Sequence, residues 1–180
     1  MLRYSAAHRR GCRLHRGLAC PGQCAGLALY RGPPHRHGTR SGPQRRQAVA
    51  KSDGDCSSLA IEALDTGQIV GAVGSHYADP RAGRFEYGIT MGAGHRRKGY
   101  AAEAVVMLLR FMFAKRRYHK CEARIFGHNE ASLALHRRLG FAEEGRLRDH
   151  VFFASRHHDL VVMGILVDEF ARLHSMSELE

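Results

Sequence analysis

Apolar and polar residues alternate from Ser57 onward and predict a β-hairpin. In SLAIEAL every second residue falls on one face of an extended chain. The sequence DTGQ favours a turn, and IVGAVGSHY continues as a strand that runs back. A second turn over ADPRAGR leads into FEYGITM, which predicts a third strand. One of its faces carries Phe85, Tyr87, Ile89 and Met91, and the other carries Glu86, Gly88 and Thr90.

The segment 99–115 predicts a long helix, because it contains no residue that breaks a helix after Gly99. Between residues 101 and 114 the only polar side chains are Glu103 and Arg110, which lie seven positions apart on one narrow stripe. A helix that is apolar over the rest of its surface must be covered nearly all round. We therefore expect it to lie against a sheet with other elements beside it.

Shorter elements follow this helix. KCEARIF predicts a strand over Lys120 to Phe126, and EASLALHRR predicts a helix from Glu130 to Arg138 that Gly140 ends. GRLRDHVFF and HDLVVMGILV predict a closing hairpin joined by ASRH. This order of elements predicts an α+β fold with a mixed, mostly antiparallel central sheet and helices on both faces.

The charge of the chain is concentrated in its first 50 residues. They hold ten arginines and no acidic residue, whereas the rest of the chain sets 18 Lys and Arg against all 17 acidic residues. The net charge of +11 therefore belongs almost wholly to this leader. The nearly neutral remainder argues against a nucleic acid partner for the domain itself.

The leader has no long apolar period and is interrupted by Gly and Pro, so we expect it not to pack. It could be a flexible basic arm that binds nucleic acid or acidic lipid, or a mitochondrial transit peptide. It could also be the product of GC-rich DNA that is translated in the wrong reading frame. We favour the last interpretation. The 180 residues then divide into an irregular basic leader (1–56), disordered or frame-shifted, one domain (57–170) and a C-terminal tail (171–180).

The cysteines and the apolar runs bear on location. Five cysteines at positions 12, 20, 24, 56 and 121 lack the paired C-x-x-C spacing of a zinc site, so we expect no metal. Their odd number and the absence of a secretion signal indicate a reducing compartment, and we expect the protein in the cytoplasm. No apolar run reaches the length of a membrane span, so we expect no membrane partner.

The stretch GHRRKGYAAEA predicts an anion site. A helix that starts at Gly99 exposes unpaired main-chain N–H groups, and Arg96, Arg97 and Lys98 add positive charge directly before it. A phosphate or pyrophosphate fits such a site. On these residues alone, a solvated basic turn is the better interpretation.

Three motifs in sequence favour the anion site. Arg96, Gly99 and Ala101 stand as R-x-x-G-x-A, followed by ARIFGHNEASLALHRRLGF and by EEGRLRDHVF with HHDLVVMGIL. Together they resemble the GNAT superfamily of acetyl-CoA-dependent N-acetyltransferases, closest to its ribosomal-protein-alanine and spermidine N-acetyltransferase branch. The resemblance covers about residues 57–170 and implies the α-β-α sandwich of the GNAT fold. Members usually place a strand and two helices in the length that the leader occupies, which is why we suspect a shifted frame.

The resemblance implies acetyl-CoA as the co-substrate and direct transfer of its acetyl group to a primary amine, such as a protein N-terminus, a polyamine or another small amine. The pyrophosphate would lie on the main-chain amides of Arg96, Arg97, Lys98, Gly99, Tyr100 and Ala101. The pantetheine arm would run beside Ile89 and Met91, with a main-chain N–H near Met91 facing the thioester oxygen. Because Cys121 starts a strand away from the expected thioester, we expect no covalent enzyme intermediate.

Four further residues are candidates for the site. Asn129 takes the position that contacts pantetheine in relatives, and it also suits an ordinary helix N-cap, with Ser132 one turn behind it. His136 stands where many relatives carry a tyrosine that acts as general acid, so it either donates a proton to the thiolate or simply flanks the coenzyme A tunnel. Glu86 is the best-placed general base for the amine, or else a solvated carboxylate at a strand edge.

Two other classes of function remain open on the sequence. One is a degenerate, non-catalytic acyl-CoA-binding domain that lacks a complete acceptor site. The other is a nucleic-acid-binding arm joined to a domain of minor importance. We also expect exposed edges of the sheet to favour pairing into a homodimer.

Overall fold

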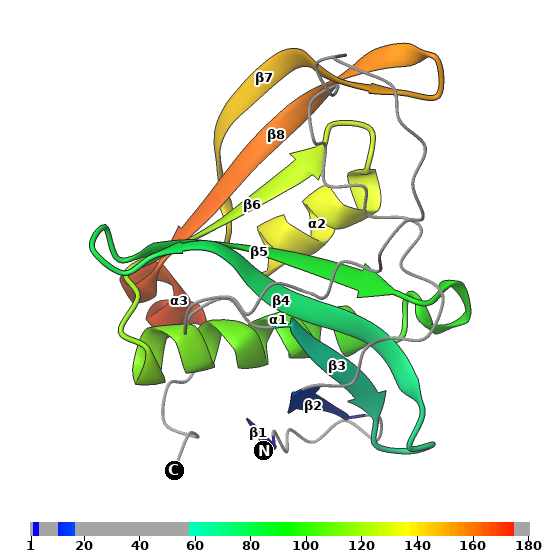
Figure 1. The fold of residues 1–180 in the computed structure, drawn as a ribbon, viewed down its shortest axis with the longest axis vertical. Coiled ribbons are helices and arrows are strands. Elements are labelled where there is room, and N and C mark those ends of the chain that lie inside the picture. Colours follow the sequence, from blue (N-terminus) through cyan, green and yellow to red (C-terminus); the bar gives the residue numbers. More distant parts are fainter. Residues whose placement is uncertain (1, 4–10, 17–57, 175–180) are drawn as a thin grey trace, which may run out of the picture.

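The computed structural model describes residues 2–3, 11–16 and 58–174 and shows one eight-stranded sheet (Figure 1). The strand order is β1-β2-β3-β4-β5-β6-β8-β7. The strands are β1 (Leu2–Arg3), β2 (Cys12–Arg16), β3 (Ser58–Ala63), β4 (Ile69–Asp79), β5 (Arg84–Met91), β6 (Lys120–Phe126), β7 (Ala142–Phe153) and β8 (Arg156–Leu166). The helices are η1 (Ala93–His95), α1 (Tyr100–Arg110), η2 (Phe111–Lys115), α2 (Glu130–Arg138) and α3 (Val167–Leu173).

The sheet is mixed and mostly antiparallel, as expected from the order of elements. Every neighbouring pair is antiparallel except β5 and β6. The predicted hairpin of β3 and β4 is confirmed, and so are the predicted strand β5, strand β6 and helix α2. The closing hairpin of β7 and β8 is also confirmed, with β7 three residues longer at its start than the sequence suggested.

The parallel pair β5 and β6 is joined over a short stretch only. Its register pairs Arg84 with Lys120, Phe85 with Cys121 and Glu86 with Glu122, and pairing stops there. Beyond Glu86, β5 stays paired with β4 as far as Met91. The main-chain groups of residues 87–91 that face β6 therefore have no ladder partner in that strand.

All three α-helices cover the face of the sheet that carries Phe85 and Tyr87. Phe85 meets Phe113 of η2 at 6.1 Å between ring centroids, and Phe113 meets Phe170 of α3 at 5.5 Å. Tyr87 meets His136 of α2 at 5.6 Å. The expectation of covering helices is confirmed for this face, whereas the opposite face carries no helix across residues 2–3, 11–16 and 58–174.

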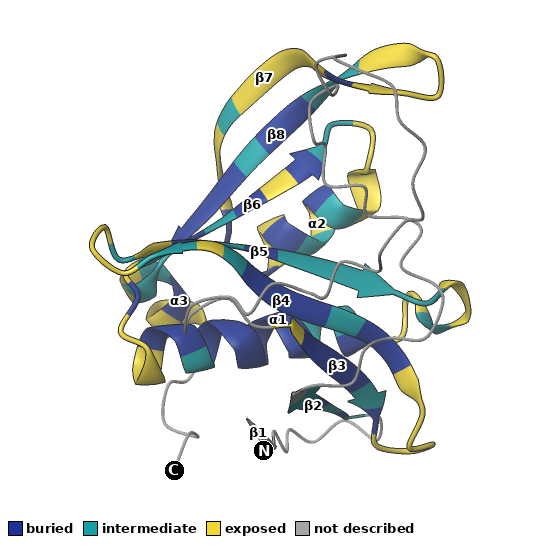
Figure 2. Ribbon diagram, in the orientation of Figure 1, coloured by how far each residue is buried: buried dark blue, intermediate teal, exposed yellow. Residues whose placement is uncertain are grey.

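The predicted long helix is confirmed over its apolar length. It begins after Gly99 as α1 and continues without a break into the wider turns of η2, which end at Lys115. Figure 2 shows α1 buried along most of its length, and Arg110 is buried with its apolar neighbours. Among the helices of the described residues, none combines the length and apolar character that a membrane span requires.

Part of the segment that we expected to be irregular is a strand. In β2 the side chains of Cys12 and Leu14 are buried, whereas Arg13 and His15 are half-buried on the other face, and Nε2 of His15 contacts the Glu62 carboxylate of β3. The expectation of an unstructured leader is therefore wrong for these residues. The alternation CRLHR is too short to stand out from the irregular sequence around it, and pairing with β3 stabilises it. The other leader residues, apart from Gly11 and those of β1, lie outside the described part of the chain.

The helix α3 was not expected. It begins directly at the end of β8 and crosses the expected domain boundary at residue 170. Phe170 is fully buried, and Glu169 accepts a hydrogen bond from the main-chain N–H of Leu166 at 2.9 Å, which caps the first turn. The ordered structure therefore extends to His174, past the start of the expected tail.

Candidate functional site

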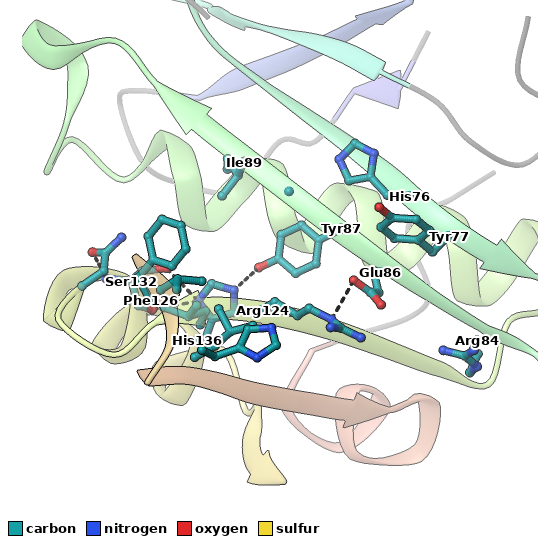
Figure 3. Close-up of a pocket in the computed structure, with 17 residues that line it drawn as sticks. His76, Tyr77, Arg84, Glu86, Tyr87, Ile89, Arg124, Phe126, Ser132 and His136 are labelled. Atoms are coloured by element: carbon teal, nitrogen blue, oxygen red, sulfur yellow. Dashed lines mark hydrogen bonds and ion pairs between the residues drawn. The ribbon is translucent and has the colours of Figure 1, made fainter. Parts of the chain in front are cut away.

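A cavity of about 560 Å³ opens where β5 and β6 part (Figure 3). This volume is typical of a site for a small molecule. Its walls come from β4, β5, β6, α2, β7 and β8, because these elements surround the gap in the sheet. Of the residues predicted for the site, Glu86, Ile89, Asn129, Ser132 and His136 line this cavity.

Glu86 lies on the face of β5 opposite Tyr87, beside the cavity. Its carboxylate Oε2 lies 3.2 Å from Nε of Arg124 on β6, and its side chain is 12% exposed. Directly across the sheet, Gly88 pairs with Gly74 of β4. Two opposed glycines leave a trough without side chains next to the carboxylate, which gives an acceptor room to approach it.

His76 is a site residue that the sequence analysis missed. It lies opposite Glu86 in the β4–β5 register and lines the cavity. Burial lowers the pKa of His76, although the nearby Glu86 charge acts in the opposite direction. The ring is therefore neutral at neutral pH and can accept a proton. No spacing along the chain places residues 76 and 86 together, since only the register of the two strands does so.

His136 is buried and both of its ring nitrogens have partners. Nδ1 lies 2.7 Å from the main-chain oxygen of Ser132, and Nε2 lies 2.6 Å from the Tyr87 hydroxyl (Figure 3). Burial lowers the pKa of His136, so the ring is neutral. A carbonyl oxygen only accepts, so Nδ1 carries the proton and the Tyr87 hydroxyl donates to Nε2. The sequence placed Tyr87 on the same strand face as Phe85 and did not predict this contact.

Asn129 is the N-cap of α2. Its side-chain Oδ1 accepts a hydrogen bond from the main-chain N–H of Ser132 at 3.2 Å. The predicted capping role is thus confirmed. The same residue lines the cavity, so its amide N–H₂ group lies where it could also contact a ligand.

The loop directly before α1, residues 96–99, has the features of an anion site, and we call it the anion loop. Arg96, Arg97, Lys98 and Gly99 are exposed, and Gly99 has a φ of 92°. No side chain caps this end of α1, and a Cβ atom at Gly99 would meet no atom within 4 Å. Because no side chain competes for the first turn, the start of α1 is a candidate site for a phosphate or pyrophosphate. Tyr100 turns its side chain into the core, so it and Ala101 offer main-chain groups.

Ile89 and Met91 mark the path between this loop and the cavity. Both lie on the stretch of β5 that has no partner in β6, and Ile89 lines the cavity while Met91 does not. An extended molecule along residues 87–91 could pair with the free main-chain groups of that stretch. The structure thus brings the cavity and the exposed loop together through one strand.

The two cysteines of the described residues are poorly suited to act as nucleophiles. Burial raises the pKa of Cys12 to about 12, with a further contribution from Glu103. Burial also raises the pKa of Cys121 well above its usual range. Neither residue lines the cavity, and a thiol must lose its proton before it attacks.

Comparison with known proteins shows the family of this chain. The model of the acetyltransferase (GNAT) domain matches residues 27–142, so the match begins within the segment that we expected to be a leader. The SPbeta prophage-derived uncharacterized N-acetyltransferase YokL of Bacillus subtilis (strain 168) is 33% identical over 116 residues, which are 64% of this chain and 64% of YokL. The chain thus spans just under two thirds of the length of this relative.

A second relative and a solved structure agree with that match. The uncharacterized N-acetyltransferase p20 of Bacillus licheniformis is 31% identical over 119 residues, 66% of this chain and 67% of p20. Mutant forms of the spermidine/spermine N-acetyltransferase SpeG from Vibrio cholerae share the fold, with a TM-score of 0.64, 23% identity and coverage of 68% and 74% of the two chains. The described sheet, the anion loop and the family match agree, and the chain belongs to the acetyltransferase (GNAT) domain family.

Proposed function

We propose that this protein transfers the acetyl group of acetyl-CoA to a primary amine by direct attack. The observation that carries the proposal is the parting of β5 from β6 after Glu86, which opens a cavity on the same strand that leads to the anion loop. Membership of the acetyltransferase family supports the same reaction.

Acetyl-CoA would bind along β5 as an extended substrate. Its pyrophosphate would lie on the main-chain N–H groups of Arg96–Ala101, with the side chains of Arg96, Arg97 and Lys98 at the rim. Its pantetheine arm would pair with the free main-chain groups of Ile89–Met91, and its thioester would enter the cavity beside Asn129 and Ser132. A main-chain N–H near the thioester oxygen would stabilise the charge that develops there, an effect of about 3–4 kcal/mol in known oxyanion holes.

The acceptor amine must lose a proton before or during its attack. Glu86 is our candidate base, directly or through a water molecule, because its carboxylate faces the trough at Gly88. His76 lies opposite, is neutral at neutral pH and offers a second acceptor for the same proton. Either residue would lie on the face of β5 from which an amine could approach.

The departing thiolate needs little help. A thiol of this type has a pKa of roughly 8.5, so its anion is only weakly basic. His136 can donate a proton only in its charged form, which burial disfavours. We therefore favour a role in which His136 holds Tyr87 in place by a hydrogen bond, and we do not favour a role of His136 as the acid. A His136→Gln variant, which keeps a polar side chain, should retain most of the turnover; a loss of 100-fold or more in kcat would restore the acid role.

The test of the proposal uses the full chain. Isothermal titration calorimetry should show binding of acetyl-CoA, and release of free thiol with a panel of amines should show transfer. Mass spectrometry after incubation with acetyl-CoA alone should show no acetyl group on Cys12 or Cys121. Absence of acetyl-CoA binding would overturn the proposal, and binding without thiol release from any amine would overturn its catalytic part.

A further inference from the structure

The cavity walls carry more positive than negative side chains. Arg84 and Arg124 line it, and Glu86 is the only carboxylate among the described residues that line it (Figure 3). That carboxylate is already paired with Arg124. A substrate with several positive charges would find like charges on these walls and one shared carboxylate.

We propose that the acceptor is a primary amine that also carries an oxyanion, a carboxylate or a phosphate, a few bonds from its amino group. This inference rests on the proposed function and names the substrate class of the same site. It separates the protein in specificity from enzymes that act on polyamines, even though its fold is shared with spermidine/spermine N-acetyltransferase SpeG.

Arg124 is the first of two side chains suited to hold the oxyanion. Its Nε faces Glu86 at 3.2 Å, and its side chain is 49% exposed. A guanidinium has five N–H donors in a planar fork, and Glu86 is the one carboxylate it contacts in the described part of the chain. The remaining donors can therefore bind both oxygens of a carboxylate or phosphate.

Arg84 is the second side chain suited to hold the oxyanion. It lies too far from the anion loop to bind the pyrophosphate of acetyl-CoA. Its side chain is 45% exposed, and its contact with Glu122 is long, at 3.8 Å. Arg84 begins β5 and Met91 ends it. At about 3.3 Å per residue, the strand separates Arg84 by about 23 Å from the end that leads to the loop at Arg96. The structure thus has two separate groups of cations, one at each end of this strand.

The part of the family match that precedes Asp53 supplies no acidic side chain that could reverse this charge. No Asp or Glu precedes Asp53, although the family match begins at residue 27. Whatever residues 27–52 contribute to an acceptor site, they contribute no carboxylate. The chain therefore offers a polycation no second negative group from that part of the matched domain.

The chemistry of the reaction agrees with an acceptor of both charges. The ammonium of such an acceptor would lie near Glu86, which can take its proton, while its oxyanion would lie on Arg124 and Arg84. Positive charge nearby also favours the neutral, nucleophilic form of the amine. The amine nitrogen then forms the bond to the acetyl carbon as the carbon–sulfur bond breaks. From ammonium to amide the nitrogen loses two protons, the first to Glu86 before the attack and the second to His76 or water as the amide forms, and the thiolate leaves with the bonding electron pair.

Matched pairs of amines test the inference. Alanine against alaninamide, and phosphoethanolamine against ethanolamine, differ in the oxyanion, and spermidine represents the polycations. With saturating acetyl-CoA, we expect kcat/KM for the better oxyanion-bearing amine to exceed that of its partner without the oxyanion at least tenfold, with spermidine the poorest substrate. The first pair distinguishes a carboxylate from the phosphate of the second. Equal rates within both pairs, or preference for spermidine, would overturn the inference and leave the proposed function standing.

Variants and binding measurements complete the test. Arg124→Gln and Arg84→Gln should each lower the preference for the oxyanion at least fivefold without changing the Kd for acetyl-CoA, whereas Arg172→Gln, at an exposed position of α3, should change neither. If no amine turns over, calorimetry with the protein–coenzyme A complex provides the readout. The same preference in Kd supports the inference, and equal binding within both pairs overturns it. Failure to bind acetyl-CoA at all is the separate failure of the proposed function.

Discussion

The Tyr87 hydroxyl donates a hydrogen bond to Nε2 of His136 across 2.6 Å, and both side chains are buried. This contact joins the strand β5 to the helix α2 at the wall of the cavity. On the far side of the ring, Nδ1–H donates to the main-chain oxygen of Ser132. The imidazole therefore links the strand to the first turn of α2.

Replacement of Tyr87 by Phe should leave Nε2 of His136 buried without a donor. An unsatisfied buried group of this kind costs about 1–3 kcal/mol, so Tyr87→Phe should lower the free energy of unfolding by that amount in urea titrations. Tyr77→Phe is the matched control, because Tyr77 is 66% exposed. Equal losses in the two variants would show that the buried hydrogen bond contributes nothing of its own.

The stability of the protein should fall as the pH is lowered below about 6.5. Burial lowers the pKa of His136 from its ordinary value of 6.5, and it lowers that of His76 as well. Below 6.5 the unfolded chain takes up protons that the folded chain takes up only at lower pH, so acid favours unfolding. Urea titrations from pH 7.5 to 5 should show this slope.

His136→Gln should reduce that slope, and His157→Gln, at an exposed position, should leave it unchanged. A slope that is the same in wild type and His136→Gln would show that the buried imidazole does not cause it.

Glu86→Gln should lower kcat by about 100-fold, because the variant lacks the base for the amine. Stability should change little, since ion pairs with a half-exposed partner such as Arg124 contribute about 1 kcal/mol or less. Steady-state kinetics measure the first effect and urea titrations the second. Glu143→Gln, at an exposed carboxylate outside the cavity, is the control. A Glu86→Gln enzyme with wild-type kcat would remove Glu86 from the mechanism.

Gly99→Ala should weaken the binding of acetyl-CoA at least tenfold in calorimetry. Its φ of 92° suits glycine, so alanine costs about 1–2 kcal/mol and shifts the N–H groups that start α1. Gly94→Ala is a close control, because a Cβ there also meets no atom within 4 Å and its φ is not positive. Unchanged affinity in Gly99→Ala, with the fold intact, would exclude this loop as the pyrophosphate site.

The sequence predicted elements well where strong local signals delimit them. The strand KCEARIF and the helix from Glu130 to Arg138 have the predicted bounds, because Asn129 caps the helix and Gly140, with a φ of 97°, ends it. The hairpin of β3 and β4 was visible because apolar residues alternate across a turn. Each of these signals is local in the sequence.

Features that depend on distant partners were not predictable in this way. The strand β2 is recognisable by its pairing with β3, and α3 by Phe170, which reaches into a core built by earlier elements. The contact of Tyr87 with His136 spans 49 positions. The spacing of residues along the chain does not predict such contacts. The contact between Tyr87 and His136 in the cavity wall is therefore visible only in the structure.

The short ladder between β5 and β6 gives the sheet a mechanical weak point. Three residue pairs hold its two halves together at this seam, and the strands then diverge. A molecule bound along residues 87–91 would form hydrogen bonds with the main-chain groups that have no partner in β6. It would therefore connect the two halves of the sheet where they are not paired. A free ligand concentration of 100 times the Kd would raise the free energy of unfolding by about 2.7 kcal/mol, which would be measured as a rise in the melting temperature.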